Sequence, residues 1–290
     1  SSLQARNFHI IRNSISNYNL TGISLASTFN MGYIDHPLEG ETATSLVIMR
    51  ASQGVKSAEI VKLLKAAGYD FKNYGAFDVE GEIRNFPLFK DTPDNFFYLQ
   101  TLAGRIYHNL WWQVEMRLNP NWAQDICKPQ IKHNMANLAD FTAELKTESA
   151  TPKFVYGHLL MPHTPYYFDR IGNPVAKPSY STNTKRSDSL YVDQLIYTNK
   201  LILNMIDSMK TNTQRPRILI IEGDHGYRDI NPNAVREKQF MNLNAWYCSD
   251  KDYSRLYDGM STVNNFRVVL NKYFNTGLPY LKDSTIDLNH

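Results

Sequence analysis

The stretch that decides the fold is Arg217–Gly226, which reads RILIIEGDHG. Its first six residues form a short apolar run, as expected for a buried strand of a parallel sheet. The next four place a carboxylate and an imidazole side by side between two glycines, at the point where the strand ends. Ligands of α/β proteins bind beyond the carboxyl ends of the strands, so we expect a functional site here.

The residue types at this strand end suit a metal ion. Asp224 and His225 offer one oxygen and one nitrogen ligand, a pair that fits Zn²⁺ or Mn²⁺ better than Ca²⁺. Gly223 and Gly226 would let the backbone turn sharply and approach a ligand closely. A plain turn with a hydrogen-bonded histidine explains the pair equally well, and the four residues alone do not decide.

Predicted strands and helices alternate on both sides of this stretch. This order predicts an α/β sandwich in which helices flank a mostly parallel central sheet. A segment near 93–148, rich in helix formers and aromatic residues, is expected to be a helical insertion. The other predicted strands are Phe8–Ser16, Tyr69–Phe77, Pro152–Leu160 and Met241–Cys248, and the predicted helices are one beginning at Thr21, then Ser57–Ala67, Tyr191–Lys210 and Thr262–Phe274.

The composition is that of a globular protein, with 290 residues of which 42% are hydrophobic and 20% charged. The formal net charge is only +3 and the basic residues are scattered, which gives no support to nucleic-acid binding. No apolar run approaches the ~18–20 residues of a membrane span, and the start shows no signal-peptide pattern. Cys127 and Cys248 could pair, but they are no disulfide framework.

Phe154–Asp169 carries two histidines. His163 lies in a loop between Pro162 and Pro165, whose rings restrict the backbone and suit a site that must be held still. His158 lies within an apolar strand, where a hydrogen-bonded core histidine is the simpler interpretation.

Thr21 begins a predicted helix in Asn17–Gly32, NYNLTGISLASTFNMG. A hydroxyl at a helix start lies where the helix dipole and the backbone N–H groups favour negative charge. That position suits a nucleophile that attacks a phosphoryl or sulfuryl group. Taken alone, however, Thr21 is more simply an N-cap.

Taken in order, these patterns resemble the sulfatase-like branch of the alkaline phosphatase superfamily. They are a threonine at a helix start followed by S-L-A-S-x-x-N, then H-x-x-x-x-H-x-P-x-Y, then G-D-H-G. The branch includes lipoteichoic acid synthases, ethanolamine-phosphate transferases, sulfatases and phosphopentomutases. The chain looks most like a bacterial membrane-anchored subgroup. The resemblance covers nearly the whole chain and implies one catalytic domain over 1–290 with an alkaline phosphatase-like α/β sandwich.

The resemblance also implies a metal-dependent hydrolase or transferase that acts on phosphate or sulfate esters. Thr21 would be the nucleophile and a metal ligand, and Asp224 and His225 would complete the ligand set. His163 would bind the anionic oxygens of the substrate or a second metal, and Arg228 could add positive charge to the same anion. The cofactor is expected to be a divalent metal, Zn or Mn first, with Ca or Mg as further candidates.

The implied substrate is a small-molecule, lipid-linked or polysaccharide-linked ester. The implied location is the periplasmic face of a bacterial inner membrane, with the membrane reached through segments absent from this chain. A non-catalytic binding or sensing module that keeps the fold is the alternative.

One departure from the family pattern motivates that alternative, and two others narrow the chemistry. Relatives carry an acidic ligand before the nucleophile, but no Asp or Glu precedes Thr21, so we expect an N-terminally truncated domain or an incomplete metal site. The absence of histidine in Tyr227–Phe240 favours a single metal. Cys127–Ile131 (CKPQI) resembles the C-x-P-x-R frame of formylglycine sulfatases, but Ile131 replaces its arginine. A threonine nucleophile therefore favours phosphoryl transfer.

Overall fold

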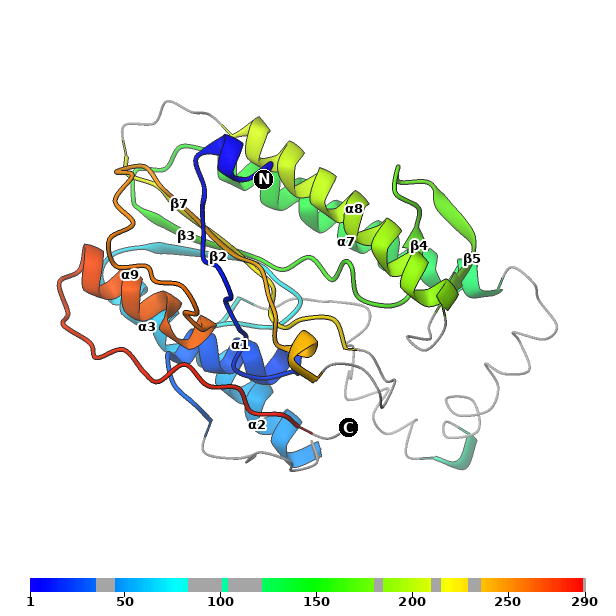
Figure 1. Cartoon of the computed structure of the whole chain (residues 1–290), viewed down its shortest axis with the longest axis horizontal. Helices are drawn as coiled ribbons and strands as arrows, with labels where there is room; N and C mark the ends of the chain where they lie inside the picture. Colours follow the sequence, from blue (N-terminus) through cyan, green and yellow to red (C-terminus); the bar gives the residue numbers. More distant parts are fainter. Residues whose placement is uncertain are drawn as a thin grey trace.

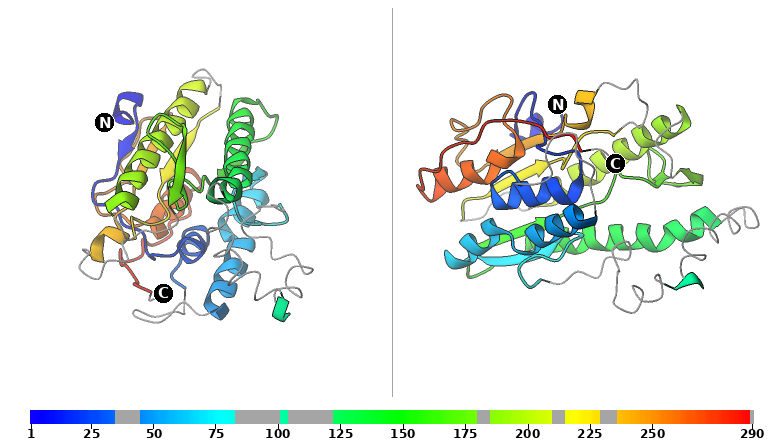
Figure 2. Two further views of the ribbon diagram at one scale, coloured as in Figure 1. Left: turned by 90° about the vertical axis from the view of Figure 1, so that its right-hand side faces the viewer. Right: turned by 90° about the horizontal axis from the view of Figure 1, so that it is seen from below.

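The computed structural model describes residues 1–34, 45–82, 101–103, 122–179, 185–209, 215–228 and 236–288. Helices lie on both sides of the strands, with α7 and α8 together on one side and α1, α2, α3 and α9 on the other (Figures 1 and 2). This arrangement is the α/β class that the sequence predicts. In the part of the chain that the structure describes, no helix is both long enough and apolar enough to cross a membrane.

The described strands form three small sheets, and only one of them is parallel. The first has the order β1-β7-β6 and is antiparallel throughout. The second pairs β2 with β3 in parallel, and the third is the antiparallel pair β4 and β5. The strands are β1 (His9–Ile10), β2 (Asp70–Tyr74), β3 (Lys153–Gly157), β4 (Tyr166–Phe168), β5 (Pro174–Ser179), β6 (Ile218–Glu222) and β7 (Asn244–Cys248).

The expectation of a mostly parallel central sheet is therefore not met by the described strands. The strand that carries the GDHG sequence, β6, pairs with β7 over its whole length, from Ile218 opposite Cys248 to Glu222 opposite Asn244. An apolar run shows that a strand is buried, but it does not show in which direction its partner runs. Cys248 is a buried free thiol, so the two cysteines do not pair.

The predicted first strand is also much shorter than Phe8–Ser16. Only His9 and Ile10 pair with β7. Asn13 takes a left-handed backbone conformation with φ of 54°, which ends an extended run. The chain after it bonds instead to the segment before β7, where the Ser16 amide donates to the Phe240 carbonyl at 2.8 Å.

The predicted helices are found, with shifted ends. The long helices α7 and α8 lie in the predicted helical segments, and Gly68, with φ of 85°, follows α3 as the stop signal predicted. Of the predicted insertion near 93–148, α7 supports the helical part, whereas 93–100 and 104–121 lie outside the described residues. The helices are α1 (Thr21–Asn30), α2 (Ser45–Lys56), α3 (Glu59–Ala66), α7 (Trp122–Lys146), α8 (Lys185–Ser208) and α9 (Asn265–Tyr273), with short 3₁₀ turns η1 (Gln4–Arg6), η4 (Arg236–Gln239) and η5 (Thr262–Asn264).

A buried apolar core lies beneath α1. Ile23, Leu25 and Phe29 of this helix pack with residues of α2, α3, β2 and α9, and the carboxy-terminal Leu288 joins the same cluster. The helix is buried nearly all round, and its Ser24, Ser27 and Thr28 are buried as well. The core therefore fixes α1, and with it the position of Thr21.

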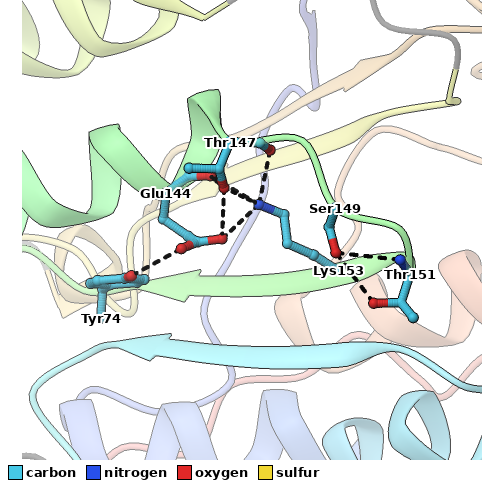
Figure 3. Close-up of polar contacts among 6 residues, drawn as sticks. All are labelled: Tyr74, Glu144, Thr147, Ser149, Thr151 and Lys153. Carbon is cyan, nitrogen blue, oxygen red and sulfur yellow. Dashed lines mark hydrogen bonds and ion pairs between the residues drawn. The ribbon is translucent and has the colours of Figure 1, made fainter.

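A polar network fixes the end of α7 to the parallel strands (Figure 3). The Lys153 ammonium lies 2.6 Å from Glu144 Oε1 and 2.7 Å from Thr147 Oγ1, and the Tyr74 hydroxyl donates to Glu144 Oε2 at 3.4 Å. The hydrogen bond from Lys153 holds the pKa of Glu144 below its ordinary value. The network anchors β3, whose carboxyl end leads into His158.

Candidate active site

Two segments that are distant in sequence meet at the carboxyl end of β6. Thr21 Oγ1, at the start of α1, lies 3.3 Å from His225 Nε2. Asp224 Oδ2 lies 3.5 Å from the same nitrogen. A hydroxyl, an imidazole nitrogen and a carboxylate thus converge, which brings together three of the residues singled out in the sequence.

Thr21 is the first residue of α1 and not its N-cap. Leu20 occupies the cap position with an extended backbone and provides no side-chain cap, and the Ser24 amide donates to its carbonyl at 2.8 Å. The Thr21 hydroxyl lies toward His225 instead of capping the helix. The Ser24 hydroxyl donates to the Asp224 carbonyl at 2.5 Å and fastens the loop after β6 to α1.

The two glycines of the GDHG loop have different roles, which corrects the expectation that both permit a sharp turn. Neither has a positive φ. A Cβ on Gly223 would meet nothing closer than 3.4 Å, whereas a Cβ on Gly226 would lie 2.0 Å from the Lys238 carbonyl oxygen and 2.6 Å from that of Met241. Gly226 is therefore needed because the chain's own backbone passes next to it.

The protonation of His225 follows from its contacts. Its Nδ1 lies 2.7 Å from the Gly226 carbonyl oxygen, so Nδ1 carries the proton and the Nε2 lone pair faces Thr21 and Asp224. Burial lowers the pKa of His225 below its ordinary value, although Asp224 opposes the shift. A neutral ring of this tautomer is the form in which histidine ligates a metal.

Asp224 is ionised in spite of its burial. Burial raises the pKa of its carboxyl group. The imidazoles of His225 and His158, which are protonated at the acid pH where the carboxyl group titrates, and the Thr21 hydroxyl outweigh this, so the pKa lies below its ordinary value. The donor set of one carboxylate, one imidazole nitrogen and one hydroxyl fits a divalent cation chemically. Among the described residues, no group of three or more His, Cys, Asp or Glu side chains is placed to hold a metal ion.

His158, which the sequence interpretation left out of the site as a core histidine, lies near Asp224 and His225. It is hydrogen-bonded as expected for a core histidine, since the Tyr156 hydroxyl lies 3.1 Å from its Nδ1. Burial lowers the pKa of His158 below its ordinary value, and the charges of Asp224, His225 and His163 act on this pKa as well. The signal for it was its place directly after β3, at the carboxyl end of a strand.

His163 and Arg228 lie at the edge of this group. His163 is exposed, its Nδ1 lies 2.6 Å from the Thr164 carbonyl oxygen, and the Gln194 amide holds its backbone carbonyl at 3.0 Å. Arg228 is half-buried. Burial lowers its pKa while Asp224 opposes the shift, which places its charge within reach of the carboxylate.

Comparison with known proteins identifies the family of this chain. The family model described as Sulfatase matches residues 1–260. The chain belongs to the sulfatase family. No curated protein matches this sulfatase-family chain. Membership in the family supports an enzyme that acts on phosphate or sulfate esters.

A solved structure supports the fold of this sulfatase-family chain. The chain resembles the C-terminal periplasmic domain of the phosphoethanolamine transferase EptC from Campylobacter jejuni, with a TM-score of 0.51 and 13% sequence identity. The match covers 94% of this chain and 80% of the other. At this identity the likeness shows the fold alone, which is alkaline phosphatase-like.

Glu222 is a second residue of this sulfatase-family chain that the sequence interpretation did not single out. It is the last residue of β6, and burial, helped by the neighbouring Asp224, raises its pKa to about 7. The Asn265 amide opposes the shift by donating a hydrogen bond to Glu222 Oε2. Asn265 Oδ1 in turn accepts a hydrogen bond from the Asn244 amide at 3.0 Å. Two consecutive hydrogen bonds thus hold the Glu222 carboxyl group at the end of β6.

Proposed function

We propose that this sulfatase-family chain is a metal-dependent enzyme that hydrolyses or transfers a phosphate or sulfate ester, with Thr21 as its nucleophile. The observation that carries the proposal is the 3.3 Å separation of Thr21 Oγ1 from His225 Nε2, next to the Asp224 carboxylate. The helix start at Thr21 has no side-chain cap, so its backbone N–H groups can donate hydrogen bonds to the anionic oxygens of an ester.

The residues that would hold the metal are Asp224, His225 and Thr21. A divalent cation, Zn or Mn, when bound there would favour the ionised form of the hydroxyl and neutralise charge that develops on the substrate. His225 offers the nitrogen that its hydrogen bond to the Gly226 carbonyl leaves unprotonated.

The chemistry assigned to the chain's own groups is a two-step transfer. The Thr21 hydroxyl gives its proton to water, its oxygen forms a bond to phosphorus or sulfur, and the bond to the leaving oxygen breaks with its electron pair. The leaving oxygen then takes a proton from water. Arg228 and His163 orient the remaining ester oxygens. Water or a second alcohol then attacks the Thr21 ester and restores the hydroxyl.

The substrate we propose is a phosphate ester of the cell envelope, linked to a lipid or a polysaccharide. The similar solved structure is a phosphoethanolamine transferase, which supports a phosphoryl group as the group that this chain transfers. That structure is described as a periplasmic domain, which supports a location of this chain on the periplasmic face. A threonine at the nucleophile position also favours phosphoryl over sulfuryl transfer. Attachment to the membrane would lie in segments outside this chain.

The test is turnover of an aryl phosphodiester and an aryl sulfate with Zn²⁺ or Mn²⁺ added. Thr21→Ala should lower kcat by at least about 1,000-fold, since loss of a nucleophile removes the whole covalent route. Thr142→Ala is the matched control, because its hydroxyl donates to the Leu138 carbonyl within α7. Full activity of Thr21→Ala would overturn the role of Thr21. A wild-type chain that binds an ester without turnover would establish the non-catalytic module instead.

A further inference from the structure

The carboxy-terminal segment 281–288 is bonded to the loop that precedes Thr21. It runs from α9 past α1 toward the end of the chain (Figure 1). The Ile286 amide donates to the Asn17 carbonyl at 2.8 Å, and the Asn17 side-chain amide donates to the Ser284 carbonyl at 2.9 Å. Leu288 is only 1% exposed and packs in the core beneath α1. The segment is thus built into the fold beside the nucleophile loop.

Three side chains form a closed triangle at this junction. The Asn19 amide donates to Asp287 Oδ1 at 2.7 Å and to Gln239 Oε1 at 3.2 Å. The Gln239 amide also donates to Asp287 Oδ1, at 3.0 Å. Asn19, which is 1% exposed, bonds the Leu288 backbone in both directions as well, at 3.1 and 3.2 Å.

The triangle connects the two halves of the proposed site. Asn19 lies two residues before Thr21. Gln239 lies in η4, and its carbonyl accepts the Gly226 amide at 2.7 Å, directly beside His225. Asn19 therefore belongs to the loop before Thr21, Gln239 bonds the GDHG loop, and Asp287 accepts hydrogen bonds from both side chains.

We propose that Asn19, Gln239 and Asp287 are a positioning triad that sets the distance between Thr21 and His225. None of the three is among the groups assigned to the reacting atoms, so the triad acts through the two loops that it joins. The carboxy-terminal segment is on this account part of the frame of the active site. The inference rests on the proposed role of Thr21.

The amide donor at residue 19 and the carboxylate acceptor at residue 287 can be exchanged by mutation. Asn19→Asp places a second carboxylate against Asp287 and removes the amide donor. Asp287→Asn alone keeps an acceptor oxygen for both amides. In the double variant the amide of residue 287 donates to the carboxylate of residue 19, and Gln239 meets both by rotating its own amide by half a turn. The Leu288 carbonyl still loses the donor that Asn19 supplies.

The experiment measures kcat and KM for the three variants at a temperature at which all are fully folded. Asn19→Asp should lower kcat by about 10- to 100-fold with KM little changed, because a catalytic group displaced by roughly 1 Å costs that order of rate. Asp287→Asn should stay within about threefold of wild type. The double variant should recover part of the lost kcat, because the bonds among the three side chains return while the bond to the Leu288 carbonyl does not. A general loss of stability would not produce this recovery.

Asn271→Asp provides the matched control. This asparagine is also buried and also ties the carboxy-terminal region to a helix, but its bonds go to Thr276 and Leu278. Its replacement should lower the melting temperature while kcat stays near wild type.

Thr21→Ala, assayed in parallel, separates the two proposals. Activity retained by Thr21→Ala defeats the proposed function itself. If Thr21→Ala is inactive, the triad is refuted when Asn19→Asp keeps the kcat of the Asn271→Asp control. It is refuted equally when the double variant is no more active than Asn19→Asp alone.

Discussion

Gly226→Ala and Gly223→Ala form a paired test of how the GDHG loop is built. Both changes add one methyl group to a glycine whose φ is compatible with alanine. The methyl on Gly226 would lie 2.0 Å from the Lys238 carbonyl oxygen, 2.6 Å from the Met241 carbonyl oxygen and 3.0 Å from the Gln239 carbonyl carbon. All three atoms are backbone, so no side-chain rotation relieves the overlap.

The size of the effect follows from these distances. Ordinary contact begins near 3.4 Å, so the loop and the 238–241 backbone must separate by more than an ångström. Overpacking of this kind costs about 1–3 kcal/mol, and a rigid backbone partner places Gly226→Ala at the upper end. The hydrogen bond from the Gly226 amide to the Gln239 carbonyl, now 2.7 Å, would be stretched as well. For a chain of this length we expect a melting temperature lowered on the order of 5–10 °C.

Activity should fall with stability in this variant only. A His225 displaced by about 1 Å from Thr21 should lower kcat by up to roughly 100-fold. Gly223→Ala, whose methyl meets nothing closer than 3.4 Å, should change the free energy of unfolding by less than about 0.5 kcal/mol. Thermal melts and steady-state kinetics of the two variants give the answer. Equal stability and equal kcat would refute the argument that Gly226 is required by the neighbouring backbone.

Other contacts make equally direct predictions. Lys153→Met should lower the free energy of unfolding by about 1.5–3 kcal/mol, because Glu144 loses the ammonium that bonds it, whereas Lys132→Met on the exposed face of α7 should be near neutral. The folded pKa of Glu144 lies below its unfolded pKa of about 4.3. The stabilisation by the Lys153–Glu144 bond is therefore complete above the unfolded pKa and is lost as the pH falls through the folded pKa. Denaturant melts of Lys153→Met and wild type should converge in acid. Chelation should abolish turnover and Zn²⁺ or Mn²⁺ should restore it; turnover by protein found metal-free by elemental analysis would contradict the metal requirement.

The sequence by itself determined the local elements and the most conspicuous site residues. Helical periodicity placed α3, α8 and α9 near their true positions, because an amphipathic stripe depends only on nearby residues. The strand before Gly223 was found for a similar reason, since an apolar run bounded by a turn signal is local. Thr21, Asp224 and His225 were singled out by their place at element ends, and these three side chains do meet in space.

Tertiary structure alone decided which elements become neighbours. The antiparallel pairing of β6 with β7, the charge contacts of His158 with Asp224, and the bond from Asn19 to Asp287 all join segments whose local sequences carry no sign of each other. The last of these spans 268 positions along the chain. Such partners are set by the path of the whole backbone around a shared core, which selects among many locally acceptable pairings the one that buries apolar surface and satisfies the polar groups together.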